Sequence, residues 1–206
     1  MSTVRIVDTV TEWSQINICD QIKLKQPPMD ENAPDDSGYD YKLVTPAAFP
    51  MYVPSTEKLP PNVHTPLPSL CVRILNGDHS LASGEGGVNI QLCFSAWNPG
   101  THGRDNLTAD GNGTYSKMSE AEAKRYFKRT GEGWRDVWNF VDIALRALEN
   151  TTEIGGYLID PNTPIEFGPL TEQESIPDFY PFWFAWVSFR IVHPLKRNVQ
   201  EFKNYL

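Results

Sequence analysis

Hydrophobic and polar residues alternate in the middle of the chain. Apolar side chains occupy every second position of one run, namely Val88, Ile90, Leu92, Phe94 and Ala96. Period two is typical of a strand with one buried face. The run Tyr180–Val192 is apolar at odd and even positions alike until Ser188 and Arg190. We expect a strand there that is covered on both faces, with the proline-rich segment described below or another subunit as the second cover.

Helical periodicity is clearest after residue 133. Apolar residues follow Trp134 at +3, +4, +7, +11 and +14, which predicts one apolar stripe along a helix of roughly four turns. We expect this helix to end at Asn150 and to pack on the sheet through Trp134, Trp138 and Val141.

Two weaker helical signals precede it. Ser119-Glu-Ala-Glu122 fits a capping box and predicts a helix that runs to about Arg129. The mixed periodicity of Val10–Leu24 predicts a short amphipathic helix with a strand tail.

Prolines concentrate early in the chain, where ten of the 17 lie between residues 26 and 68. Proline lacks a backbone donor, so this stretch cannot form a long helix or a central strand. Aromatic residues are interspersed with the prolines. The sequence therefore predicts an extended arm that lies against its own domain or a neighbouring subunit, with these contact residues: Tyr39, Tyr41, Phe49 and Tyr52.

Shorter apolar runs complete the expected sheet. Leu70–Leu75 predicts a strand that ends at the turn dipeptide Asn76-Gly77, and Tyr157–Ile159 and Ile165–Phe167 predict two more strands. The order of elements predicts an α+β fold, in which a mainly antiparallel sheet carries one or two helices packed on one face and a proline-rich extended arm.

Length and charge narrow the classes of function. The 206 residues suffice for one core domain, which we place at 69–206, preceded by the N-terminal helix, strand and arm at 1–68. A net charge of −8 opposes binding to nucleic acids and anionic membranes. The longest apolar run is too short to span a bilayer, and Met1–Val10 lacks the apolar stretch of a signal peptide. We expect a soluble, cytoplasmic protein.

Motifs for catalysis and cofactor binding are missing from the sequence. Neither GxSxG, GxxxxGK[ST] nor GxGxxG occurs, and the four histidines share no metal-ligand spacing. Gly84-Glu-Gly-Gly87 precedes a strand and lacks a lysine, which predicts a hairpin turn rather than a phosphate loop. The three cysteines form no CxxC motif. We expect no catalytic residue, cofactor or metal ion.

The basic residues of one segment form a cluster, namely Lys117, Lys124, Arg125, Lys128 and Arg129. Such a run is usually a solvated face. Because like charges one turn apart repel mildly on a helix, an acidic protein surface is the alternative that would stabilise it.

Two other classes of function stay open. One is a small soluble hydrolase that uses Asp78, His79 and Glu172 in a pocket. The other is a carbohydrate- or peptide-binding module that binds through exposed tryptophans: Trp97, Trp134 or Trp186.

The order of motifs resembles that of a known family. The likeness spans roughly residues 10–192. The segments that carry it are Trp13 with the following Ile-Lys-Leu-Lys, Tyr41-Lys-Leu-Val-Thr-Pro46, Phe49-Pro-Met-Tyr-Val-Pro54, Leu59-Pro60, Pro68–Ile74, Val88–Ala96, Gly133–Asp142, Pro164-Ile165 and Pro181–Trp186. Together they resemble the tail-completion or tail-terminator proteins of tailed phages and prophages of Gram-positive bacteria. The glycine-rich stretch Asn98–Tyr115 is longer than this family's pattern.

The resemblance implies a non-enzymatic virion protein that is assembled in the host cytoplasm. Its α+β subunits would form a hexameric ring that caps the tail tube, and the sheath in a contractile tail. The ring would present a joining surface to the neck or connector proteins of the head, while DNA passes through the lumen without specific binding. A neck or head-tail adaptor is the nearest alternative. The assembly surfaces would be the aromatic residues of the arm, Trp186, and the basic residues Lys124, Arg125, Lys128 and Arg129.

Overall fold

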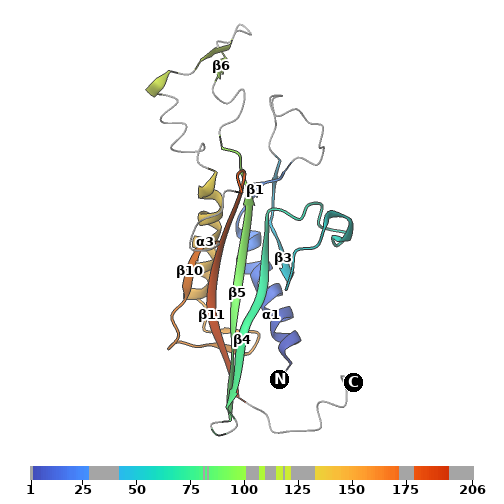
Figure 1. Cartoon of the computed structure of the whole chain (residues 1–206), viewed down its shortest axis with the longest axis vertical. Helices are drawn as coiled ribbons and strands as arrows, with labels where there is room; N and C mark the ends of the chain where they lie inside the picture. The colour runs from blue at the N-terminus through green and yellow to red at the C-terminus, as the bar shows by residue number, and fades with distance from the viewer. Residues whose placement is uncertain are drawn as a thin grey trace.

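A computed structural model describes most of the chain, and it has an α+β fold. The residues described are 2–27, 42–80, 82, 84–100, 107–109, 115–117, 119–121, 133–171 and 179–194. A mostly antiparallel seven-stranded sheet has the order β3-β4-β5-β11-β9-β8, and β10 also pairs with β11. In Figure 1 the long strands lie in front and both labelled helices lie behind them. The predicted fold class is confirmed, apart from the arm, part of which lies outside the described residues.

Three long strands form the centre of the sheet, and shorter strands flank them. The long strands are β4 (Ser69–Ser80), β5 (Glu85–Trp97) and β11 (Phe182–Pro194). The flanking strands are β3 (Ala47–Pro50), which runs parallel to β4, and the antiparallel β8 (Glu153–Ile154), β9 (Tyr157–Ile159) and β10 (Glu166–Pro169).

The other elements among the described residues are two helices, two antiparallel pairs of short strands and two 3₁₀ turns. The helices are α1 (Thr3–Asn17) and α3 (Trp134–Glu149). In the strand pairs, β1 (Leu24–Lys25) lies antiparallel to β2 (Leu43–Val44), and β6 (Leu107–Ala109) lies antiparallel to β7 (Tyr115–Lys117). The 3₁₀ turns are η1 (Cys19–Gln21) and η2 (Thr56–Lys58). No described helix is long and apolar enough to cross a membrane.

The core lies between the sheet and the two helices. The alternating apolar residues of β5 are all buried, as predicted. Helix α3 buries Val137, Val141 and Leu148 of its predicted stripe, together with Phe140 and Ala144. Phe140 on α3 meets Phe94 on β5 edge to face, with 4.9 Å between ring centroids. Ile6 and Val10, one turn apart on α1, belong to the same core cluster. Helix α1 and the strands after residue 69 thus share one hydrophobic core.

Helix α1 starts earlier than predicted. The expected range was Val10–Leu24, but the helix begins at Thr3, where the side chain of Ser2 accepts a hydrogen bond from the backbone N–H of Arg5. It ends at Asn17, and the predicted strand tail is β1. The buried face of α1 begins at Ile6, whereas the sequence predicted a helix only from Val10.

The turn predicted at Asn76-Gly77 is wrong. Strand β4 continues through both residues to Ser80, and the pairing register with β5 shifts between Ile74 and Asn76. A bulge of this kind absorbs an extra residue without ending the strand. The hairpin turns before β5 instead, where Gly84 has a φ of +72° and its N–H donates to the carbonyl of Ser80.

Candidate functional site: an aromatic groove

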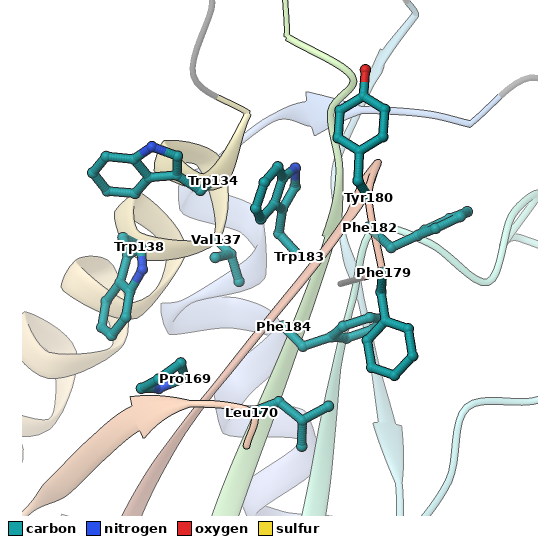
Figure 2. A pocket seen from close by; sticks show the side chains of 10 residues that line it. All are labelled: Trp134, Val137, Trp138, Pro169, Leu170, Phe179, Tyr180, Phe182, Trp183 and Phe184. Atoms are coloured by element: carbon teal, nitrogen blue, oxygen red, sulfur yellow. The ribbon is translucent and has the colours of Figure 1, made fainter. Parts of the chain in front are cut away.

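An apolar groove lies where α3 begins, beside the first residues of β11 (Figure 2). Its volume is about 310 Å³. The lining residues come from the start of α3, the end of β10 and the approach to β11: Trp134, Val137, Trp138, Pro169, Leu170, Phe179, Tyr180, Phe182, Trp183 and Phe184. Seven of these ten residues are aromatic, so a ligand in the groove would meet mainly ring faces and edges.

Side chains on both faces of β11 line the groove. Figure 2 shows Trp183 on the side of α3, with Phe184 and Phe179 on the other side of the strand. Phe179 and Phe184 meet edge to face at 5.7 Å, and Tyr180 meets Trp183 in the same way at 6.4 Å. The groove therefore wraps around the edge of the sheet rather than lying within the helix–sheet core.

The polar atoms of two lining rings, Trp183 and Tyr180, are hydrogen-bonded to backbone carbonyls. The indole N–H of Trp183 donates to the carbonyl of Asn98 at 2.8 Å, and the hydroxyl of Tyr180 donates to the carbonyl of Pro99 at 2.9 Å. These bonds fix the orientation of both rings. Because these polar atoms are already bonded, both rings offer mainly their hydrocarbon faces and edges for contact.

Several lining side chains remain open to solvent. The exposed fractions are 41% for Trp134, 43% for Leu170, 45% for Phe179 and 57% for Tyr180. The expectation that Trp134 packs between helix and sheet is therefore wrong, and this residue stands at the rim of the groove. A cluster of large exposed apolar side chains marks a surface that binds a partner or ligand. Tryptophan and tyrosine are also the side chains most enriched among binding hot spots.

A polar junction centred on Asn98 holds the elements around the groove. Its amide accepts from the ammonium of Lys25 on β1 at 2.9 Å and donates to the carboxylate of Asp136 on α3 at 2.7 Å. Burial raises the pKa of Asp136, while the Asn98 hydrogen bond and the charge of Lys25 oppose that shift. Gly133 lies so close to the Asn98 carbonyl that a β-carbon there would collide with it. The junction therefore fixes the start of α3 against the end of β5.

Trp186, a predicted assembly residue, lies on the sheet face opposite the helices. Its register partners are Cys93 on β5 and Gly168 on β10, and its indole N–H donates to the carbonyl of Pro169 at 3.0 Å. The ring is half-buried. In Figure 1 no labelled helix lies on this face. The expected cover for the second face of β11 stays a prediction.

The other predicted assembly residues divide into two groups. Phe49 is buried in β3, whereas Tyr52 just after that strand is 67% exposed and can reach a neighbour. The rest of the predicted set lies outside the described residues: Tyr39, Tyr41, Lys124, Arg125, Lys128 and Arg129.

The structure describes some of the residues considered for the two alternative functions, a hydrolase and a binding module. Asp78 forms an ion pair with Arg190, and His79 meets His193 edge to face at 5.6 Å. Glu172 lies outside the described residues. Trp97, considered for a binding module, is buried. In the part of the chain that the structure describes, no three or more His, Cys, Asp or Glu side chains are grouped to hold a metal ion.

The groove as a whole was not predicted. Trp134, Trp138 and Trp183 were assigned to packing, while Leu170, Phe179 and Tyr180 were given no role. One signal was available: five of the six residues in Phe179–Phe184 are aromatic, more than one buried strand face needs. No model of a known protein family matches the chain, and a search of curated proteins finds no relative.

Proposed function

We propose that the chain is a structural subunit of a phage tail, a tail terminator that assembles as a ring on the end of the tail tube. The observation that carries the proposal is the exposed aromatic groove, a surface suited to contact between protein subunits. The α+β architecture, with two helices on one face of an antiparallel sheet, agrees with the fold that the resemblance implies.

Burial of the groove supplies a driving force for assembly. Each fully buried large apolar side chain contributes about 1.5–3 kcal/mol relative to its exposed state. Trp134, Leu170, Phe179 and Tyr180 are each at least two-fifths exposed in the single chain. Their common burial would offset part of the entropy that association costs.

The charge of the chain suits a ring through which DNA passes. A net charge of −8 per subunit gives −48 for six copies. Positive walls would retain the phosphate backbone, whereas a negative ring does not. In this proposal DNA crosses the lumen without specific binding, and the protein partners are other copies of the chain, the tube protein and the neck or connector proteins. The basic residues Lys124, Arg125, Lys128 and Arg129 would meet an acidic face of one of these proteins.

Deletion of the gene from the virus or prophage that encodes this chain tests the proposal. Because an uncapped tube has neither a stop nor a joining surface, electron microscopy should show separate heads and free tails, some of them longer than normal. Supplying the chain from a plasmid should restore whole particles. Free tails of uniform normal length would indicate a neck adaptor instead, and intact infectious particles would contradict a tail role.

A further inference from the structure

The last twelve residues of the sequence, 195–206, have the pattern of an amphipathic binding segment. Their large apolar residues are Leu195, Val199, Phe202 and Leu206, at relative positions 0, +4, +7 and +11. This spacing places all four on one face of a helix. Helices that lie in apolar grooves present anchors at the same spacing. A twelve-residue helix is marginal alone in water, so a groove would supply its stability.

The segment leaves the sheet at the end opposite the groove. Phe182, Trp183 and Phe184 line the groove at the start of β11, and Pro194 ends that strand twelve residues later. At about 3.3 Å per residue the strand is roughly 40 Å long. Figure 1 shows β11 running along the length of the sheet.

The segment therefore cannot dock as a helix in the groove of its own chain. Twelve residues reach about 40 Å only when fully extended, whereas the same residues as a helix span about 18 Å. The return path alone would use the whole segment. A groove that binds it must belong to a second copy.

Charge favours the same contact. Residues 195–206 hold three basic residues and one acidic residue, a charge of +2, so the rest of the chain carries −10. The stretch that joins Leu170 to Phe179, two lining residues, holds three acidic residues and no basic one. Opposite charges on the two partners steer association and fix its register.

We infer that the aromatic groove of one copy binds residues 195–206 of a second copy, so that the chains join head to tail. Phe202 is the aromatic anchor, and the contact covers Phe182 and Phe184 on the second face of β11. The inference names the partner of the groove and rests on the proposed function only in assuming that copies assemble. A head-to-tail contact repeats, and it closes into a ring when the rotation between copies allows.

Binding of a labelled peptide tests the contact directly. The peptide contains residues 194–206 with a fluorescent label, and the receptor is the full chain with Phe202→Arg, whose groove stays empty. We expect saturable anisotropy with a dissociation constant below about 1 mM. The peptide has no tryptophan, so a change in protein tryptophan emission on binding would come from the receptor, which has Trp134, Trp138 and Trp183 at the groove.

Matched substitutions locate the site. Leu170→Arg in the receptor places a positive charge in the groove and should weaken binding at least tenfold, as should Phe202→Ala in the peptide. Leu75→Arg changes a leucine of similar exposure on β4, 47% against 43%, and should leave binding unchanged. No saturation up to about 1 mM, or equal binding by the two arginine variants, would overturn the inference.

Mixing two full-length variants tests the polarity of the contact. A groove variant, Leu170→Arg, retains a normal segment 195–206, and a segment variant, Phe202→Arg, retains a normal groove. One working contact remains between them, so the mixture should form a heterodimer of about 47 kDa, twice the 23.3 kDa of the chain. No heterodimer at concentrations that saturate the peptide would contradict head-to-tail joining.

The outcomes separate this inference from the proposed function. If the peptide fails to bind while deletion of the gene still yields free tails, the inference is wrong and the tail role stands. If the peptide binds but deletion leaves particles intact, the tail role is wrong and the contact stands.

Discussion

Asn98 connects three elements through one side chain and its own backbone. Its amide oxygen accepts from Lys25 and its amide nitrogen donates to Asp136, while its backbone carbonyl accepts from the indole of Trp183. A side-chain amide carries an acceptor oxygen and a donor nitrogen on one carbon, so a single uncharged group makes both bonds. It bridges an ammonium and a carboxylate as a neutral link, which an aspartate or a leucine at this position could not do.

Asn98→Ala should lower the free energy of unfolding by about 1–3 kcal/mol at pH 7. The loss should be smaller at pH 4. Burial raises the pKa of Asp136, so the folded state is penalised only where this carboxylate is ionised. The penalty is absent below the unfolded pKa, grows between the unfolded pKa and the raised folded pKa, and is fully present above the folded pKa. Because Asn98 stabilises the ionised form, its removal costs more at neutral pH.

Urea unfolding of wild type and variant at both pH values measures this difference. Asn17→Ala is the control, since the side chain of Asn17 donates to the Trp13 carbonyl at the exposed end of α1. That variant should show the same small effect at both pH values. An equal loss at pH 4 and pH 7 for Asn98→Ala would contradict the role assigned to Asp136.

At the scale of elements, regular periodicity made α3 and β5 predictable. Trp134–Glu149 and the alternation from Val88 to Ala96 each repeat one pattern over many residues. The strand through Asn76-Gly77 was not predictable in this way, because a register shift and the hydrogen bond from Asn89 to Asn76 keep these turn-forming residues in β4. Pairing with a neighbouring strand thus overrode local preference.

The groove could not be predicted from the sequence, because it depends on how separate elements contact one another. Leu170 lines the same groove as residues of α3 because β10 pairs with β11, and that pairing register is not visible in a single sequence. Periodicity identified which residues are apolar. It could not show that Trp134, Phe179 and Tyr180 gather at the edge of the sheet instead of in the core.

Gly133→Ala should disturb the start of α3. The new β-carbon would meet the backbone carbonyl of Asn98, which cannot move without shifting the end of β5. We expect a loss of about 1–3 kcal/mol in the free energy of unfolding. Gly87→Ala is the comparison, because the nearest atoms that its β-carbon would meet all belong to the guanidinium of Arg190, the far end of a flexible side chain.

Thermal unfolding of the two glycine variants, read by circular dichroism, measures the difference. The melting temperature of the Gly133 variant should fall by several degrees. That of the Gly87 variant should fall less, because the Arg190 side chain can move at the cost of its ion pair with Asp78. Equal losses in the two variants would contradict a tight junction between α3 and β5.

At the scale of the whole molecule, the chain has two different ends. The aromatic groove lies at the start of β11, and the segment that we expect to fill it follows the end of that strand. A contact between these two ends can repeat from copy to copy, or it can close in a twofold dimer in which two copies exchange their segments. A repeating contact is the geometry that a ring on a tail tube requires.

The native molar mass in solution tests this assembly most directly. Light scattering coupled to size exclusion, from about 1 µM to about 1 mM of the full chain, should reveal a discrete species near 140 kDa, six times the 23.3 kDa of the chain. Assembly should be lost in the Leu170→Arg variant and kept in the Leu75→Arg variant. A mass of 23.3 kDa at every concentration, or a closed dimer near 47 kDa, would contradict a self-assembling ring.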